Sequence, residues 1–309
     1  MLKTSEKLQL IQKLSGLTQQ ELADSFGVSF VAFNAWINNK SAPRAKALGK
    51  IDELYREYTG EKTIPADLLS AKKNIIFKKG KKTGNILKKI LKNRDIYENF
   101  VLALIYHSNR IEGSSLSESD TAAIIFDGVA LPNKTLVEQL EAKNHQTALD
   151  YLLSHAQKKG RINEDFVLKL HGILMNSIIS DAGFYRKHGV RIVGSNVPTA
   201  NFLKIPVLMK DFFKKVNENQ KDTISQIANL HATFEKIHPF GDGNGRIGRL
   251  IIIAQLLKNN LPPAVILQEK RRAYLAYLNK AQLQNDTSLL EDFLGDAILE
   301  GFEILERKK

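Results

Sequence analysis

The chain has 309 residues, of which 43% are hydrophobic and 25% charged, an ordinary balance for a globular protein with a buried core. It contains no cysteine, which excludes disulfide scaffolds, thiolate zinc sites and cysteine nucleophiles. The formal net charge is +12, but residues 59–95 alone hold eleven lysine and arginine residues against three acidic ones, so the basic excess is local.

Apolar runs are too short for a membrane span of ~18 residues, and the longest, residues 250–257, is interrupted by Gln255. The first ten residues lack the apolar core of a secretory signal. These observations predict a cytoplasmic protein with no membrane partner.

Residues 1–58 are expected to form a small helical domain. Thr18 and Glu21 are spaced as a capping box, which starts a helix directly after Thr18. Gly27 ends this short helix in a tight turn, and Ser29 caps the next one. Two short helices joined in this way are the layout of a helix-turn-helix.

This segment resembles the small DNA-binding domains of the lambda-repressor/Cro type. The resemblance lies in Leu22, Ala23, Gly27, Val28, Ser29, Trp36 and Pro43. It implies DNA as a partner through residues 18–44, and a homodimer, because such domains often pair. The alternative is a helical bundle without a DNA role, since residues 1–58 hold eight basic against six acidic residues, a weak charge for phosphate contact.

Residues 59–95 are expected to connect this domain to the rest of the chain. Nine lysines lie between Lys72 and Lys92, interleaved with apolar residues, so the segment is not a flexible glycine-serine linker. The lysines indicate either a solvated helix face or a basic surface that helps the N-terminal domain to hold nucleic acid.

Residues 96–309 are expected to form one large all-α domain, with a single interruption. Helical spacing of apolar residues occurs over residues 97–109, 135–157, 163–178, 205–216, 222–236, 244–258, 271–284 and 288–306. The stretch 184–203 differs, because alternation over residues 190–193 followed by Gly194 and Pro198 predicts a short β-hairpin.

Residues 238–249 read HPFGDGNGRIGR and carry the chemistry. Four of these twelve residues are glycine, and they lie between two apolar helices, where they allow a turn with positive φ. The helix that follows presents free N–H groups and its positive dipole end, which suits phosphate. Arg246 and Arg249 are three residues apart on one side of that helix, and two guanidiniums there suit a polyphosphate.

Two further side chains of this string are chemically competent. Asp242 offers hard oxygen ligands for Mg²⁺, and His238 titrates near neutrality and can take a proton from a hydroxyl. The alternative is a packed structural turn, but four glycines, each costing up to ~1 kcal/mol in regular structure, argue against it. The string is not a Walker loop, because no Gly-Lys-Ser/Thr follows.

The string resembles the signature of the Fic/Doc AMP transferase family, His-x-Phe-x-Asp/Glu-Gly-Asn-Gly-Arg-x-x-Arg, and the resemblance covers residues 96–309. It implies a compact helical domain with a short β-hairpin flap. It also implies transfer of AMP from ATP to a Ser, Thr or Tyr hydroxyl of a protein, with release of pyrophosphate. ATP and a target protein, the chain itself included, are then the partners.

The resemblance assigns a role to each residue of the string. His238 would deprotonate the target hydroxyl, and Asp242 would hold Mg²⁺ against the α- and β-phosphates. Arg246 would hold the inner phosphates and Arg249 the γ-phosphate. Phe240 would anchor the turn in the core. The remaining anion-hole residues would be Gly243, Asn244 and Gly245.

Two assignments lie outside the string. The hairpin would act as the family's flap, which clamps the target backbone by strand addition, through Arg191, Ile192 and Val193. Tyr274 is the candidate wall of the adenine pocket.

Residues 108–113 read SNRIEG and end an expected helix over residues 97–113. A carboxylate at a helix C-terminus meets the negative dipole end, so Glu112 is better explained by an arginine partner. The string is similar to the family's inhibitory motif, Ser/Thr-x-x-x-Glu-Gly/Asn. By this resemblance Glu112 pairs with Arg249 in the γ-phosphate seat, and Ser108 supports the helix by hydrogen bonding. The enzyme would then inhibit itself.

Three other functions are kept open. The chain could be a DNA-binding transcription regulator or antitoxin-like protein with a nucleotide-sensing Fic half. It could remove AMP, or it could transfer another nucleotide or a phosphocholine. The pair of Arg246 and Arg249 favours a triphosphate as the donor.

Overall fold

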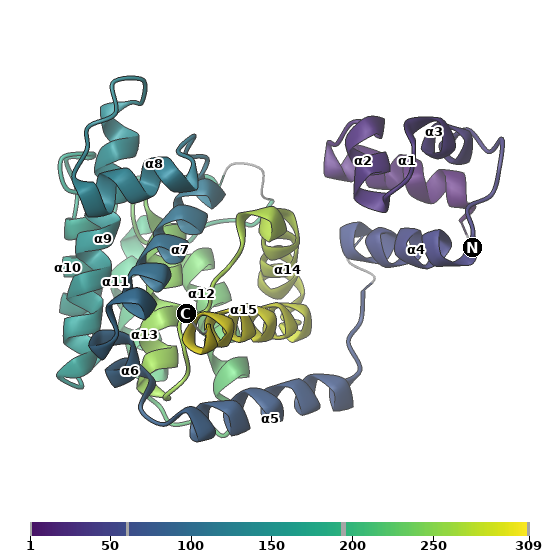
Figure 1. Ribbon diagram of the computed structural model, residues 1–309. Helices are drawn as coiled ribbons and strands as arrows, with labels where there is room; N and C mark the ends of the chain where they lie inside the picture. The colour runs from purple at the N-terminus through teal and green to yellow at the C-terminus, as the bar shows by residue number, and fades with distance from the viewer. Residues whose placement is uncertain (1, 60–61, 193–195, 308–309) are drawn as a thin grey trace.

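A computed structural model describes residues 2–59, 62–192 and 196–307, and within them the chain folds into α-helices with no β-strand (Figure 1). The predicted all-α class is confirmed. No helix of this described part is both long enough and apolar enough to span a bilayer. The molecule consists of a small N-terminal bundle and a larger body, each built around its own hydrophobic cluster.

The N-terminal bundle contains α1 (Thr4–Ser15), α2 (Gln19–Phe26), α3 (Phe30–Ile37) and α4 (Ala45–Thr59). Its caps are those predicted. Thr18 Oγ1 accepts from Glu21 N at 3.2 Å, and Glu21 Oε2 accepts from Thr18 N at 2.8 Å. Gly27 ends α2 at φ 70°, and Ser29 Oγ accepts from Ala32 N at 3.3 Å.

In Figure 1 this bundle stands beside the body, and α4 contacts α14 (Arg271–Gln284). The bundle's buried hydrophobic residues are Leu8, Ile11, Leu22, Ala23, Phe26, Phe33, Trp36, Ile37 and Ile51. None of them belongs to the cluster of the body, so the bundle has a core of its own.

The body is formed by the remaining helices. They are α5 (Ala66–Thr83), α6 (Ile86–Lys92), α7 (Arg94–Glu112), α8 (Glu118–Ala122), α9 (Leu136–Gln157), α10 (Glu164–Leu174), α11 (Ile205–Val216), α12 (Thr223–Ile237), α13 (Asn244–Lys258), α14 and α15 (Ser288–Glu306), with a π-turn at Ala123–Asp127 and 3₁₀ turns at Phe202–Lys204 and Gln268–Lys270.

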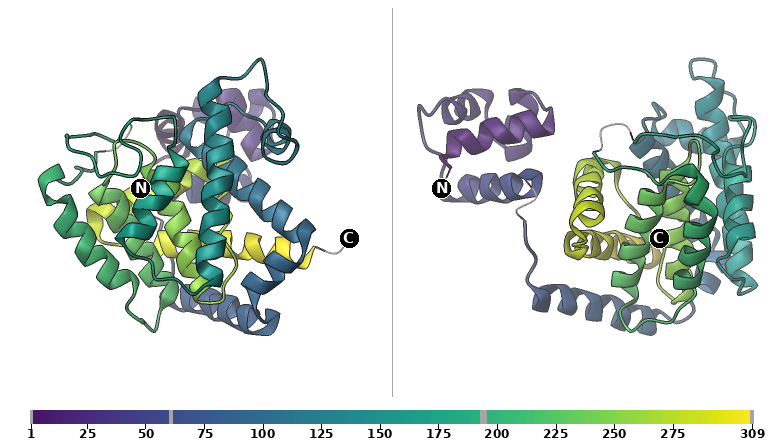
Figure 2. Two further views of the ribbon diagram at one scale, coloured as in Figure 1. Left: turned by 90° about the vertical axis from the view of Figure 1, so that its left-hand side faces the viewer. Right: turned by 180° about the vertical axis from the view of Figure 1, so that it is seen from behind.

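Helices α5 and α6 belong to the body, although residues 59–95 were expected to connect two domains. Ile76, Ile86 and Ile90 are at most 1% exposed and lie in the body's core. Figure 2 shows α5 running along the base of the body, where it contacts α15. Lys72 pairs with Asp292 and Asp296, and Lys73 pairs with Asp222 and Glu291, so part of the basic excess is neutralised internally.

Helix α13 is the centre of the body. Thirteen of its fifteen residues are buried, and α7, α9, α10 and α12 pack around it. A helix that is apolar on every side is stable only when other helices surround it. This burial fixes the position of its N-terminus, where the glycine-rich turn lies.

The predicted hairpin is wrong for the described residues of the stretch 184–203, which contain no strand; Val193 lies outside the described residues. Arg186, which is 2% exposed, donates to the carbonyls of His188, Ala200 and His238 at 2.6, 2.6 and 2.7 Å. One guanidinium therefore satisfies backbone acceptors on both arms of the stretch, in place of a strand ladder. Arg191 and Ile192 lie in irregular backbone.

Candidate active site at the start of helix α13

The turn between α12 and α13 is rigid. His238 and Gly243 both have positive φ, at 51° and 78°. Phe240 is fully buried, as predicted, and stacks on His171 with ring centroids 3.7 Å apart. The Asn244 amide accepts from Phe240 N and donates to Phe240 O, both at 2.9 Å. This amide therefore braces the turn, and Gly243 N donates to Asp242 Oδ1 at 2.6 Å.

Arg246 is held in place by a carboxylate from another helix, α9. Its side chain is 2% exposed, and Nη1 donates to Glu141 Oε1 of α9 at 2.7 Å. Asp242 Oδ2 lies 3.8 Å from Nη2, while Nε has no hydrogen-bond partner within the described part of the chain. The orientation of the Arg246 side chain is thus fixed, and its buried Nε remains available as a donor. Sequence reasoning missed Glu141, because a glutamate on a helix face carries no signal of its partner.

Arg249 makes the predicted contact with Glu112. Nη2 donates to Glu112 Oε1 at 2.6 Å, and Nε donates to Ser108 Oγ at 2.8 Å. Ser108, which was predicted to support the helix by hydrogen bonding, accepts from the arginine directly. Partial burial alone would raise the pKa of Glu112, but the charge of Arg249 outweighs it and holds this pKa below its ordinary value.

The Glu112 carboxylate lies over the first turn of α13. A Cβ atom on Gly245 would collide with Glu112 Oε1 and would come within 3.2 Å of Arg249 Nη1. Only glycine therefore allows the carboxylate to approach the helix start this closely. The Glu112 carboxylate therefore lies at the helix start for which the glycine-rich turn predicts anion binding.

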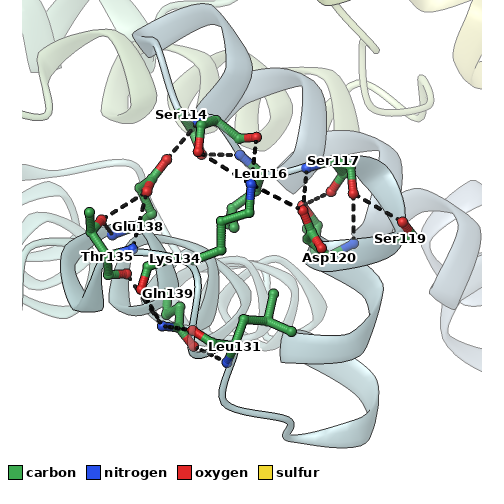
Figure 3. A network of polar contacts seen from close by, with 12 residues as sticks. Ser114, Leu116, Ser117, Ser119, Asp120, Leu131, Lys134, Thr135, Glu138 and Gln139 are labelled. Carbon is green, nitrogen blue, oxygen red and sulfur yellow. Dashed lines mark hydrogen bonds and ion pairs between the residues drawn. The ribbon is translucent and has the colours of Figure 1, made fainter.

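The segment after Glu112 is fastened to the start of α9 (Figure 3). Ser115 N donates to Glu138 Oε1 at 2.6 Å, and Lys134 Nζ donates to Ser115 O at 3.2 Å. Lys134 also pairs with Asp120 of α8 at 3.4 Å. These contacts hold the end of α7, and with it the carboxylate of Glu112, against the body.

His238 has the tautomer that a general base requires. Its Nδ1 lies 3.2 Å from the carbonyl oxygen of Glu235. Because a carbonyl only accepts, Nδ1 carries the proton of the neutral ring, and Nε2 keeps its lone pair. Burial lowers the pKa of His238 below its ordinary value. The ring is therefore neutral at pH 7 and can accept a proton.

Glu235 is a buried carboxyl that sequence reasoning missed. It is 5% exposed, and Oε1 has no hydrogen-bond partner in the described residues. A Cβ atom on Gly248 would collide with it. Burial raises the pKa of Glu235 to about 8, although Arg249 nearby acts in the opposite direction. A signal existed, because Ile227, His231 and Glu235 are four residues apart and share the buried face of α12.

Replacing Glu235 with glutamine is expected to remove a pH dependence of stability. The carboxyl is protonated in the folded state up to about pH 8 but ionises near 4.5 when unfolded, so wild type loses stability as pH rises between these values. Glutamine does not titrate. Between pH 5 and 8.5, the variant should gain on the order of a few kcal/mol relative to wild type in denaturant unfolding.

The matched control for this experiment is Glu118→Gln, on an exposed position of α8. Its stability should follow the wild-type curve at every pH. Unfolding curves for Glu235→Gln that run parallel to wild type between pH 5 and 8.5 would show that the Glu235 carboxyl is ionised in the folded protein.

Tyr274, the predicted wall of an adenine pocket, is buried in the core. It is 1% exposed, its ring stacks on Phe293 with centroids 5.8 Å apart, and its hydroxyl lies 2.6 Å from His231 Nε2. Apolar neighbours on α14 and α15 draw the aromatic ring into the core beneath the site. By contrast, the side chain of Asp242 is 62% exposed at the turn.

Comparison with known proteins supports the sequence resemblance. Residues 161–256 match the model of the Fic/DOC family, and residues 9–61 match that of a helix-turn-helix. The first match contains the whole turn at α13, and the second contains α2, α3 and α4.

Curated relatives are named protein adenylyltransferases. The chain is 35% identical over 181 residues to the protein adenylyltransferase Fic of Nematostella vectensis, a match that covers 57% of this chain and 42% of that protein. It is 32% identical over 185 residues to the protein adenylyltransferase fic-1 of Caenorhabditis elegans, covering 58% and 36%. The chain thus spans about two fifths of the length of these relatives.

Solved structures share the fold. A Fic family protein from Desulfovibrio desulfuricans superposes with a TM-score of 0.64 at 26% identity, over 80% of this chain and 78% of that one. A fragment of Fic-1 from C. elegans superposes with a TM-score of 0.68 at 23% identity, over 84% and 79%.

Proposed function

We propose that this chain, which contains a Fic/DOC domain and an N-terminal helix-turn-helix domain, transfers AMP from ATP to a Ser, Thr or Tyr hydroxyl of a protein. One observation carries this proposal. A carboxylate, that of Glu112, lies on the first turn of α13 and is bound there by Arg249 at 2.6 Å. An anion thus occupies the place where the γ-phosphate of ATP would bind, which also makes the enzyme self-inhibited.

The residues around the turn fit a triphosphate with Mg²⁺. In the described residues no group of three or more His, Asp or Glu side chains could hold a metal ion alone. Mg²⁺ is commonly bound by one or two carboxylates plus substrate phosphates and water, and the exposed Asp242 provides such a carboxylate. Bound there, Mg²⁺ would neutralise phosphate charge.

The chemistry assigned to the chain is a proton transfer and an anion clamp. His238 Nε2 takes the proton of the target hydroxyl as its oxygen forms a bond to the α-phosphorus. The bond from that phosphorus to pyrophosphate breaks, and pyrophosphate leaves with the electron pair. Arg246 and the backbone N–H groups at the start of α13 hold the phosphates in line, so positioning and charge provide the rate.

Mass spectrometry of the Glu112→Gly protein after incubation with ATP and Mg²⁺ tests the proposal. Because the chain is among its own candidate targets, the expected result is a covalent AMP adduct on the chain or on an added lysate protein. ATP binding with no adduct on any protein would instead support a nucleotide-sensing role.

The imidazole of His238 is expected to titrate below pH 6.5 in the ATP-free protein. Burial disfavours its charged form, so the pKa is lowered and the base stays neutral down to lower pH. NMR of histidine-labelled protein measures this midpoint, with the signal assigned by its absence in His238→Ala. A midpoint above 6.5 would mean that the ring is protonated in part at neutral pH and is poorly suited as a base.

A second function is supported by the helix-turn-helix match. Phe30 and Val31, at the start of α3, are 44% and 76% exposed, as residues that enter a DNA groove would be. We propose DNA as a further partner, bound by a homodimer. A gel shift with the DNA upstream of the chain's own gene, and size-exclusion chromatography with and without that DNA, test the two statements separately.

A further inference from the structure

A cavity lies at the opposite end of α13 from the catalytic turn. It has a volume of about 810 Å³ and is bounded by α6, the end of α9, the start of α10 and the end of α13. Ala254 on its wall is ten residues beyond Asn244, or ~15 Å along the helix axis. The cavity is therefore separate from the catalytic turn, and its volume is within the roughly 300–1,000 Å³ of small-molecule sites.

The floor of this cavity is apolar and mainly aliphatic. Its apolar lining residues are Leu87, Leu91, Leu152, Ala156, Ile162, Phe166, Ala254 and Leu257. Leu91 is 38% exposed, so part of this floor is in contact with water. A ligand that covered it would gain the free energy of removing apolar surface from water.

All charged Lys, Arg, Asp or Glu residues that line the cavity are basic, and we call these five the rim cations. Five lining residues are basic and none is acidic; the basic ones are Lys88, Lys92, Lys159, Arg161 and Lys258. In the part of the chain that the structure describes, none of the five takes part in an ion pair, whereas Lys72 and Lys73 of α5 are neutralised by α15. Uncompensated positive charge therefore surrounds an apolar floor, and it is complementary to an anion.

Three of the four amide side chains on the wall already make hydrogen bonds within the protein. Asn85 Oδ1 accepts from Lys88 N at 2.8 Å, and Asn217 Nδ2 donates to Ile162 O at 2.8 Å. Asn260 donates to Gly84 O at 2.7 Å and accepts from Ile86 N. The eight apolar side chains of the lining outnumber its four amides, which are Asn85, Gln157, Asn217 and Asn260, so the lining favours an aliphatic ligand over a nucleotide.

We propose that this cavity binds an amphipathic anion, with an aliphatic chain on the floor and a carboxylate or phosphate head among the five rim cations. The proposal is independent of the reaction at α13. Lys88 and Lys92 lie on α6, within the basic stretch 59–95, and the proposal assigns that stretch a ligand in place of nucleic acid.

Calorimetric titration of the full chain with decanoate, below its micelle concentration, tests the proposal. We expect saturable binding of decanoate and at least about tenfold weaker binding of decanol, which has the same chain without the charge. Lys88→Glu/Lys92→Glu should weaken decanoate binding at least about tenfold. The matched control is Lys78→Glu/Lys81→Glu, which reverses two exposed lysines of α5 outside the cavity and should change the affinity by less than about twofold.

A second variant tests the floor without changing charge. Ala156→Trp places a large side chain in the cavity from a partly exposed position, so it should abolish decanoate binding while the melting temperature stays near wild type. Decyl phosphate, titrated beside decanoate, shows which head group is preferred. Where Ala156→Trp unfolds the protein, the charge variants alone decide.

Several results would overturn the proposal. It would be overturned if decanoate did not bind, if decanol bound with the same affinity as decanoate, or if the α5 control variant weakened decanoate binding as much as Lys88→Glu/Lys92→Glu does. Labelled single-stranded DNA is titrated in the same way. If the wild-type protein bound this DNA but not decanoate, and Lys88→Glu/Lys92→Glu abolished the DNA binding, the rim would be assigned to nucleic acid.

Discussion

Replacing Glu112 with glycine is expected to raise AMP transfer, self-labelling included, by roughly 5- to 150-fold, the usual range for the coupling of two competing ligands. The carboxylate binds the guanidinium of Arg249 at the start of α13, the group to which the proposed function assigns the γ-phosphate. Without the carboxylate, Arg249 becomes available to the nucleotide. Transfer of label from α-phosphate-labelled ATP, followed over time, measures the change.

Two variants act as controls for this release. Glu118→Gly removes an exposed carboxylate from α8, six residues away, and should leave the rate at the wild-type level. Glu112→Gln keeps the size of the side chain but loses its charge, so it should give an intermediate rate. A Glu112→Gly protein that labels no faster than wild type, with ATP bound at equal affinity, would show that the contact does not inhibit.

Replacing His238 with alanine, in the Glu112→Gly background, is expected to lower AMP transfer about 10²- to 10⁴-fold. The loss follows from the removal of Nε2, the lone pair that accepts the hydroxyl proton. ATP binding should change by less than about twofold in calorimetry, because the proposed function assigns the phosphates to Arg246, Arg249 and backbone N–H groups and not to His238. The two measurements separate chemistry from binding.

The matched control is His188→Ala, which removes an exposed histidine outside the turn. It should keep the parent rate of self-labelling. If His238→Ala labelled as fast as its parent, another group would accept the proton, and the assignment of the base would be wrong.

Local signals predicted much of the fold. The capping pair Thr18 and Glu21 starts α2 where expected, and α11, α13, α14 and α15 have the predicted bounds. These features depend on contacts within three or four residues, which are visible in the sequence. The hairpin prediction was wrong because a strand, unlike a helix cap, depends on contacts outside its own segment. Alternation indicates a strand only when a partner strand forms, and in this stretch the carbonyls of His188 and Ala200 are bound by Arg186, while that of Val190 is bound by Thr199 Oγ1.

The turn at residues 238–249 was predicted from its own residues, together with the partner of Arg249. Glu112 and Arg249 are 137 positions apart, and it was the resemblance to the Fic/Doc family that joined them. Glu141 and Glu235, which no motif marks, were missed. A carboxylate that pairs with an arginine far away in the sequence has the same local sequence pattern as a carboxylate in water. Burial and partners arise only when the chain folds.

Sequence alone therefore determined which chemical groups the site has, since a glycine-rich turn, two arginines and a histidine are adjacent along the chain. Apart from the pair of Glu112 and Arg249, only the tertiary structure decided which charges are paired. It buried Glu235 beneath His238, neutralised Lys72 and Lys73 against α15, and left Lys88 and Lys92 free beside a cavity. The physical reason is that electrostatic interactions act through space over a few ångströms and depend on burial, neither of which sequence spacing specifies.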